Sequence, residues 1–442
     1  MNISVGRISL SFPLNLVVTD VDAASPHKDT LLSVRRLQVN VQLLPLLKKQ
    51  VEVDGISLQG ATVNSNDLIH GMKLNGTLGE LFISSHGVAL DPETAIVNKV
   101  LLKDTDLSLC LNDTAAADTA ASDPTYWKII LQDIDLQNVS FALDMPLDSL
   151  SLAASLDNAT LRDGLIDLHK SAYSLQTFRI KNGRVRYDSG RPSATASADS
   201  LSAGLDPSHI ALTDIGVKLD SLYYEGRNMK AVISQFVLKE RSGVEIVSTE
   251  GRLVSNDKVL RVPSLKLETR DSYLELNAAM DWDALDFKKE GLVSARLMAD
   301  IGKPDVVRFM GSMDEKFIRK YPSEPLRIRT GIDGDLNKLK LTTLTAELPG
   351  ALELFAKGEL TSLTDSLLRG GDITLQAETK DLKFISTLAE GIEIPYGTRL
   401  EGKFTMAGPK MGTDLLLMQP EAHAVAAADT IPITVYNDSI SV

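Results

Sequence analysis

Apolar residues in this chain return at intervals of three, two, three and two positions, and this spacing restricts the folds that the chain can adopt. In "VEVDGISLQGATV" the series is Val53, Ile56, Leu58, Ala61 and Val63. An amphipathic helix uses intervals of three and four, and a flat strand uses intervals of two. Each interval of three therefore inserts one residue into a strand, as a β-bulge or a tight corner does. We expect short strands joined by corners, with every apolar side chain on one face.

The same intervals recur in three other segments, which indicates a loose internal repeat. Asp, Asn and Gly residues, which tolerate turn-like backbone, stand at or near the long intervals. Gly60, Asn138 and Asn182 are examples. The three further series are Leu131, Ile134, Leu136, Val139 and Phe141; Leu175, Phe178, Ile180, Gly183 and Val185; and Leu336, Leu339, Leu341, Leu344 and Ala346.

Alternation of apolar and polar residues fills much of the remaining sequence, as between Ile8 and Leu16. Such alternation is typical of half-buried strands in antiparallel sheets. Gly-containing pairs predict turns between strands, and they begin at Asp54, Asn75, Asn182, Ser189, Ser242 and Asp333. We predict an all-β fold with a few short helices, in which a long, curved, mainly antiparallel sheet is rolled into an open, solenoid-like groove.

Helical patterns are confined to three short segments. Residues 303–321 carry a proline near the start and apolar residues at helical spacing, which predicts a helix. Residues 380–391 end in a glycine suited to a C-terminal cap. Residues 45–49 are long enough for a single turn.

The organisation along the chain follows from these patterns and from two stretches of small polar residues, 112–125 and 188–200. We expect an N-terminal β segment in residues 1–111, a flexible loop in 112–125 and a middle β segment in 126–300. A helical insertion in 301–330 and C-terminal β repeats in 331–442 complete the prediction. Both ends of the sequence already alternate, so we expect the natural chain to continue beyond them.

Composition excludes several classes of function. The net charge of −13 and a pI near 5.0 argue against nucleic acid, whose phosphates require a basic surface. The short basic runs in the sequence also do not mark an anionic membrane surface. Cys110 is the one cysteine, so an intramolecular disulfide cannot form. No apolar run reaches the ~18 residues of a membrane-spanning helix.

The sequence contains no recognisable catalytic or metal-binding motif, so we expect neither an enzyme nor a cofactor. The histidines are scattered, without the spacing of a metal site. The segment 333–337, "DGDLN", resembles the start of a calcium loop but lacks its glycine and closing glutamate. The acidic segment 281–286, "DWDALD", is interpreted as a solvated turn anchored by Trp282, and Cys110 as an inert strand residue.

An apolar sheet face must be covered, and the sequence leaves two covers open. The ordinary cover is protein, either a second sheet or a solenoid that closes on itself. The other is lipid, whose acyl chains would occupy an open trough. The composition favours a wide trough, because aromatic residues make up only 5% of the chain and long helices that could cover the face are missing.

The segment 34–63, "VRRLQVNVQLLPLLKKQVEVDGISLQGATV", resembles the AsmA-like family, and within it the TamB-type (translocation and assembly module) proteins of Gram-negative bacteria. In that family an alternating strand leads through a leucine-rich turn into the stepped apolar pattern. Segments 130–143 and 332–365 resemble further repeats, and 6–21 resembles the segment that follows the membrane anchor of the family. The anchor helix itself and the C-terminal domain of the family have no counterpart in this sequence.

The resemblance implies a periplasmic protein anchored in the inner membrane, with a curved sheet (a β-taco) whose hydrophobic groove moves phospholipids towards the outer membrane. It also implies a role in outer-membrane protein assembly with a barrel partner of the BamA/TamA type. It supplies no catalytic residues. By their phase in the pattern, the residues that would line the lipid groove are Val51, Val53, Ile56, Leu58, Val63, Leu131, Ile134, Leu136, Phe141, Ile180, Val185, Leu339 and Leu341.

Three functional hypotheses follow. The first is a periplasm-spanning groove that conducts phospholipids between the inner and outer membranes. The second is an assembly factor for outer-membrane β-barrel proteins, whose free sheet edge would template a client strand. The third is a closed structural β-solenoid.

Overall fold

The computed structural model describes most of the chain in a series of segments. These are residues 2–11, 15–24, 30–42, 53–65, 71–89, 93–112, 126–190, 204–286, 291–309, 315–363, 365, 367–387, 396–408, 410–418, 430–436 and 439–441. The chain divides into two compact units. The first comprises Met1–Leu201 and Asp206–Arg241, and the second comprises Ser202–Leu205 and Ser242–Val442. This division falls inside the expected middle segment 126–300, whereas residues 113–125 of the expected loop lie outside the described residues.

The first unit consists of strands. They are β1 (Asn2–Ser11), β2 (Asn15–Ala24), β3 (Thr30–Val41), β4 (Val53–Asn64), β5 (Met72–Ala89), β6 (Thr94–Leu111), β7 (Lys128–Met145), β8 (Leu150–Asp167), β9 (Ala172–Leu175), β10 (Thr177–Ser189), β11 (His209–Glu225) and β12 (Asn228–Glu240). Neighbouring strands pair antiparallel, except that β6 and β7 pair parallel.

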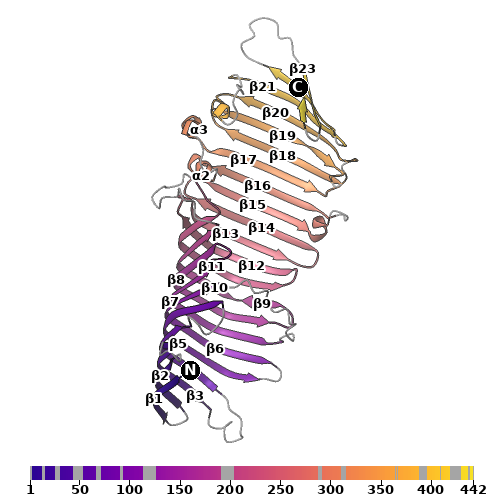
Figure 1. The fold of residues 1–442 in the computed structure, drawn as a ribbon. Coiled ribbons are helices and arrows are strands. Elements are labelled where there is room, and N and C mark those ends of the chain that lie inside the picture. The colour runs from indigo at the N-terminus through magenta and orange to yellow at the C-terminus, as the bar shows by residue number, and fades with distance from the viewer. Residues whose placement is uncertain are drawn as a thin grey trace. The chain divides into compact units, whose positions relative to one another are not determined.

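The second unit is also built mainly of strands, which lie side by side in chain order from β13 to β22 (Figure 1). They are β13 (Glu245–Ser255), β14 (Val259–Thr269), β15 (Tyr273–Asp281), β16 (Val293–Ile301), β17 (Leu326–Gly334), β18 (Lys338–Leu348), β19 (Leu352–Thr361), β20 (Gly370–Thr379), β21 (Arg399–Ala407), β22 (Lys410–Met418), β23 (Thr430–Tyr436) and β24 (Ser439–Ser441). The short helices are η1 (Trp282–Leu285), α2 (Lys303–Phe309), α3 (Glu315–Lys320) and η2 (Ile385–Thr387). The prediction of an all-β fold with a curved, mainly antiparallel sheet is confirmed.

The helical predictions have different outcomes. The described parts of residues 303–321 include two short helices, α2 and α3, and residues 310–314 lie outside the described residues. The helix predicted for 380–391 is wrong over its described part, which has turns and the single 3-10 turn η2. Leu382 and Phe384 are both buried in one apolar cluster, and a helix does not place residues two apart on the same face. The turn predicted for 45–49 lies outside the described residues.

The inserted residues of the first unit line up across its strands. Between Gln137 and Val139 the ladder to β8 skips Asn138 and its partner Asp157. Each neighbouring ladder skips at the same level, so that the skipped residues form a line across the sheet, which we call the first crease. Its members are Gly6, Asp20, Arg35, Gly60, Gly79, Asp104, Asn138, Asp157 and Asn182.

Left-handed backbone marks this crease and explains which residue types occur there. Asn138 has a φ of 51° and Asn182 a φ of 54°, and Gly60 has a φ of 62°. Asn, Asp and Gly adopt this conformation with the least steric cost, because their side chains are short or absent. Asp20, Asp104 and Asp214 of the same unit also have positive φ within strands. The crease thus uses the residues that tolerate its geometry.

A second crease crosses β6, β7 and β8 six positions along each strand from the first. Its residues are Asn98, Gln132 and Asp163, which the ladders skip as well. A strand that crosses both creases therefore has two intervals of three between its successive apolar residues. The three-two-three-two spacing of residues 131–141 is the direct result, and Leu131, Ile134, Leu136, Val139 and Phe141 share one face.

Several predicted turns are corrected by this geometry. The pairs that begin at Asp54, Asn75 and Asn182 lie inside β4, β5 and β10. The pair at Asn182 lies at the first crease, in the middle of a strand, where Asn182 adopts the left-handed backbone conformation. The pairs at Ser242 and Asp333 do lie at or beside connections between strands.

Replacing Asn138 by valine tests the crease. A β-branched residue is strained at positive φ, so we expect Asn138→Val to lower the free energy of unfolding of the first unit by about 1–2 kcal/mol. Asn138→Gly, which also removes the side chain, should stay within about 0.5 kcal/mol of the parent. Urea unfolding followed by Trp127 fluorescence in a Trp282→Phe background measures both.

Gln137→Val is the matched control, because Gln137 is the preceding residue and has no positive φ. If this variant is destabilised as strongly as Asn138→Val, the crease conformation is not the cause.

Candidate functional site: the apolar face of each sheet

In the first unit, the residues between the two creases form two continuous apolar rows that run across the strands. Leu136 pairs with Leu102 on one side and with Ala159 on the other, and Ala159 pairs with Ile180. The same row continues through Leu81, Leu58, Leu37, Val18 and Ile8 in one direction and Val217 in the other. The second row passes through Leu10, Leu16, Val39, Ile56, Ile83, Val100, Ile134, Leu161, Phe178 and Leu219.

The second unit repeats this arrangement on one face of its sheet. Leu341 pairs with Ile332 of β17 and with Gly358 of β19, and Gly358 pairs with Ile373. A second row beside the first links Leu276, Leu297, Thr330, Leu344, Ala356 and Leu375. The ladder skips between Leu341 and Leu344, which gives the interval of three in this repeat.

Protein covers these faces only in part among the described residues. Ile56 is 37% exposed and Phe141 is 39% exposed, and on the edge strand Ile8 is 66% exposed. In a packed core such side chains would be fully buried. On the first unit's apolar face the fully buried apolar residues are Ala23, Val34, Ala159 and Ile215.

One end of the apolar face in the second unit is covered. Phe317 and Tyr321, from α3 and the residue that follows it, pack against Phe384 and Leu348. The rings of Tyr321 and Phe384 lie 5.2 Å apart between centroids. Burial raises the pKa of Tyr321. This cluster is the packed core that the sheet and the short helices share, and it is confined to the ends of the strands.

The opposite face of each sheet is charged and paired. In the second unit, Arg327 lies 3.4 Å from Glu347 and Arg399 lies 3.2 Å from Glu378, in each case on the neighbouring strand. In the first unit Lys239 lies 2.7 Å from Asp214. Exposed pairs contribute little stability, but they keep this face in water and fix which face of the sheet is the apolar one.

The sheet of the first unit bends towards its apolar face at the creases. A Cβ atom at Gly183 would lie 3.3 Å from Cγ2 of Ile180, across the first crease. A Cβ atom at Gly164 would lie 2.9 Å from Cδ2 of Leu161, across the second. Apolar side chains that flank a crease therefore approach each other, which makes the apolar face the inner side of each bend.

Eleven of the residues predicted to line a groove lie on these apolar faces. They are Ile56, Leu58, Val63, Leu131, Ile134, Leu136, Phe141, Ile180 and Val185 in the first unit, and Leu339 and Leu341 in the second. Val51 lies outside the described residues, and of Val53 only the backbone, in β4, is described. The register joins Leu58, Leu136 and Ile180 in one row. That they contact lipid stays a prediction.

Two open hollows among the described residues lie on the charged faces. One of about 640 Å³ in the second unit surrounds Phe355 and is rimmed by Arg327, Glu347 and Glu378. One of about 380 Å³ in the first unit lies over Ser140 and Ser155 and beside arginines. The hollow around Phe355 is bordered by side chains that pair with one another, so we assign it no ligand.

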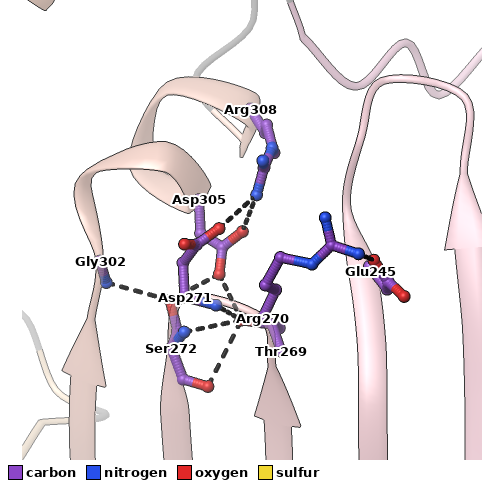
Figure 2. A network of polar contacts seen from close by, with 8 residues as sticks. All are labelled: Glu245, Thr269, Arg270, Asp271, Ser272, Gly302, Asp305 and Arg308. Carbon is purple, nitrogen blue, oxygen red and sulfur yellow. Dashed lines mark hydrogen bonds and ion pairs between the residues drawn. The ribbon is translucent and has the colours of Figure 1, made fainter.

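A buried carboxylate forms the most connected polar cluster (Figure 2). Asp305, at the start of α2, is 1% exposed. Its Oδ1 accepts a hydrogen bond from Arg308 at 2.9 Å, and its Oδ2 accepts one from the Ser272 hydroxyl at 2.6 Å and another from the Thr269 hydroxyl. Arg308 also bonds Asp271 at 2.7 Å. We call these five residues the Asp305 clamp.

The Asp305 clamp is a structural joint. Both carboxylate oxygens are occupied by side chains of the protein, which leaves no open position for a ligand. Burial disfavours the charge of Arg308, but hydrogen bonds to Asp271 and Asp305 outweigh this and raise its pKa. The clamp fastens α2 to the turn between β14 and β15. Sequence reasoning missed it, because its two parts, at residues 269–272 and 305–308, lie more than 30 residues apart and carry no spacing signal.

The acidic motifs of the sequence are turns. Trp282 in "DWDALD" donates from Nε1 to the Asn256 carbonyl at 2.8 Å, which confirms the interpretation as an anchored turn. In "DGDLN", Asp335 Oδ1 accepts backbone hydrogen bonds from Asn337 and Lys338 and thereby closes a turn without a metal. Cys110 lies in β6, with its Sγ 3.4 Å from Asn112 Oδ1. No group of His, Cys, Asp or Glu within the described segments is arranged to hold a metal ion.

Comparisons with protein-family models, with curated proteins and with solved structures find no match for this chain. Within the part of the chain that the structure describes, none of the helices has the length and apolar character needed to cross a bilayer.

Arg308→Ala tests the Asp305 clamp. The substitution leaves the buried Asp305 charge uncompensated, so we expect the second unit to lose about 3 kcal/mol of its free energy of unfolding. Urea unfolding followed by Trp282 fluorescence in a Trp127→Phe background measures this loss.

Adding Asp305→Asn to Arg308→Ala removes the stranded charge and should restore part of the loss. Lys403→Ala, which breaks an exposed pair with Asp372, is the control and should change little. No recovery in the double variant would mean that Arg308 acts through packing alone.

Proposed function

We propose that the apolar faces carry phospholipid acyl chains and that the chain serves as a hydrophobic bridge along which phospholipids pass between two membranes. The observation that carries this proposal is the pair of unbroken apolar rows between the creases, whose members are mostly half-buried and in part exposed. The opposite face is charged and ion-paired, so the apolar rows are the surface that gains from an apolar occupant.

The dimensions of the rows fit several acyl chains. In the first unit a row runs from β1 to β12 with β9 left out, and strands ~4.8 Å apart give a length of roughly 50 Å. One leaflet supplies about half of a ~30 Å hydrocarbon core, so that an acyl chain spans about 15 Å. A surface of this length suits a series of lipids better than a single bound molecule. Movement of lipid along it requires no catalytic residue and no cofactor.

The resemblance to TamB-type proteins supports the same proposal and supplies its setting. The setting that it implies is the periplasm, with the bridge held at the inner membrane by an anchor and acting towards the outer membrane. The half-buried apolar rows support lipid carriage over a closed structural solenoid, because a closed solenoid buries such rows against its own chain.

A second function, assembly of outer-membrane barrel proteins, is supported by strand β1. Among the described strands β1 pairs with β2 alone, and all ten of its residues are exposed. Ile3, Val5, Ile8 and Leu10 alternate along it. A strand with so little charge is suited to pairing with a further strand, which in this function comes from a barrel client or a partner of the BamA/TamA type.

Leu136→Glu tests lipid carriage. A carboxylate in the middle of the apolar row makes contact with acyl chains unfavourable, so we expect purified protein to retain at most about a tenth of the parent's phospholipid. Native mass spectrometry and quantified lipid extraction measure the amount. Leu341→Glu applies the same test to the second unit.

Gln137→Glu is the control, because it adds the same charge to the next residue on the opposite face. It should retain lipid as the parent does. The proposal fails if the parent protein, purified without detergent, carries no lipid. It also fails if the control Gln137→Glu loses as much lipid as Leu136→Glu. Recovery of a barrel protein by a lipid-free parent would favour the assembly function.

A further inference from the structure

The first crease divides the strands of the first unit into two classes. Each strand has two residues between the apolar positions that flank the crease, and the ladders skip one of the two. In β1 the skipped residue is Gly6, which comes before the paired residue Arg7. In β2 it is Asp20, which comes after the paired residue Thr19. We call the first kind an early strand and the second kind a late strand.

The other strands that cross the first crease belong to the same two classes. The skipped residues of the early strands β1, β3, β5 and β8 are Gly6, Arg35, Gly79 and Asp157. The skipped residues of the late strands β2, β4, β6, β7 and β10 are Asp20, Gly60, Asp104, Asn138 and Asn182. Every skipped residue of the late strands has a positive φ, and those of the early strands do not. A late strand therefore needs Gly, Asn or Asp at this position.

The direction of pairing determines which classes can be neighbours. Reversing a strand exchanges early for late, so an antiparallel pair keeps its skipped residues level only when its strands belong to different classes. A parallel pair must combine strands of one class. The antiparallel ladders from β1 to β6, and those of β8 with β7 and β10, each join an early strand to a late one. The parallel ladder joins the late strands β6 and β7.

The second crease follows the same rule. There the parallel strands β6 and β7 skip Asn98 and Gln132, in each case the first of the two residues. Their neighbour β8, which is antiparallel to β7, skips the second, Asp163, whose φ is 50°. Thus β7 is late at the first crease and early at the second, and the rule holds at both.

β1 is an early strand with one side turned away from β2. Among the described strands it pairs with β2 alone. Its apolar residues are between 43% and 67% exposed, and they are Ile3, Val5, Ile8 and Leu10. Beside the crease lies Arg7, which is exposed and forms no ion pair with any residue that the structure describes.

The residues equivalent to Arg7 indicate the charge of a residue that would face it. On the ladders between β1 and β10 these residues pair with one another across the strands, and no pair carries like charges. Glu80 faces Lys103, and Arg36 faces Gln59 and Thr19. An acidic residue opposite Arg7 would complete this pattern, because opposite charges on facing strands attract each other.

We propose that β1 accepts, on the side turned away from β2, an antiparallel late strand of another polypeptide. The inference rests on the second proposed function and names the kind of strand that β1 takes. Along that strand the order is apolar, any residue, apolar, acidic, then Gly, Asn or Asp, then apolar, any residue, apolar. The acidic residue faces Arg7, and the residue after it adopts the left-handed conformation at the level of Gly6.

The crease selects this occupant over other strands. A strand of strict alternation matches β1 on one side of Gly6 only, because beyond the crease its apolar side chains lie on the opposite face. A second copy of β1 is also early, so an antiparallel pair of two copies would have its skipped residues out of line. The crease thus limits self-association through an exposed strand, which other proteins limit by charge or proline.

The test uses a fluorescein-labelled peptide that copies β2 (Asn15–Ala24) with Thr19→Glu, because β2 is a late strand that complements β1. The control peptide has the same composition, but Asp20 is moved to its C-terminus, which leaves strict alternation. We expect the control to bind the full chain at least about tenfold more weakly, since it can match only half of β1. Fluorescence anisotropy measures both affinities.

Arg7→Ala tests the acidic position. This variant should bind the glutamate peptide about threefold more weakly than the parent does, and it should bind a peptide that keeps Thr19 as the parent does. Arg36→Ala is the matched control, because Arg36 lies at the same level on β3, which is paired on both sides. It should change neither affinity. If the two variants behave alike, the acidic position is wrong.

Hydrogen exchange of the backbone amides locates the bound peptide. Binding should slow the exchange of β1 and leave that of β2 unchanged, because β2 keeps its place. Faster exchange in β2 would mean that the peptide has replaced β2, and slower exchange confined to other strands would place it elsewhere. Either result overturns the inference.

The remaining outcomes separate the inference from the function on which it rests. If the chain binds both peptides equally, β1 accepts strands regardless of the crease, so the inference is overturned and the assembly function stands. If it binds neither peptide, β1 accepts no strand, and the assembly function fails with the inference. Dimerisation of the chain that the glutamate peptide prevents would show that β1 pairs with itself, which also overturns the inference.

Discussion

The fold of the first unit depends on one constraint. Where the ladder skips an inserted residue in one strand, it must also skip a residue at the same level in the neighbouring strand. In a pleated strand a shift of one position moves every following side chain to the other face. If the insertions were out of line, apolar and charged residues would mix on both faces. The ladders avoid this because they skip at the same level, as Asp104, Asn138 and Asp157 show. The aligned creases keep one face apolar from strand to strand.

The separation of the two faces has an energetic consequence. Each square ångström of apolar surface removed from water is worth about 25 cal/mol, and the apolar rows leave part of theirs exposed, as at Ile8 and Ile56. The charged face has no such tendency, because its groups are hydrated and paired. Affinity for apolar ligands is therefore built into one face by the same register that forms the sheet. A substitution such as Leu136→Glu opposes that affinity without altering the ladder.

The sequence predicts the apolar face well, because spacing alone determines which side chains share a face. Leu131, Ile134 and Leu136 lie together as predicted. Spacing does not reveal which residue adopts the left-handed conformation. At the second crease the skipped residue of β7 is Gln132, which has no positive φ, whereas the Asp163 that faces it has a φ of 50°. The same limit explains the turns predicted at Asn75 and Asn182, since one dipeptide serves both a hairpin and a crease.

Features that arise from distant segments were beyond the sequence. The Asp305 clamp joins a turn to a helix, so no local pattern predicts it.

The parallel ladder between β6 and β7 shows how the creases survive a change in strand direction. In the antiparallel ladders a left-handed residue faces a partner without positive φ; Asp20 faces Gly6 and Asn138 faces Asp157. In the parallel ladder two left-handed residues face each other, and Asn138 donates to Asp104 at 2.9 Å. Because both strands run the same way, both creases cross this ladder in the same order. The apolar rows of β1–β6 therefore continue into β7 without interruption, and a lipid lying across this junction would meet the same surface on either side.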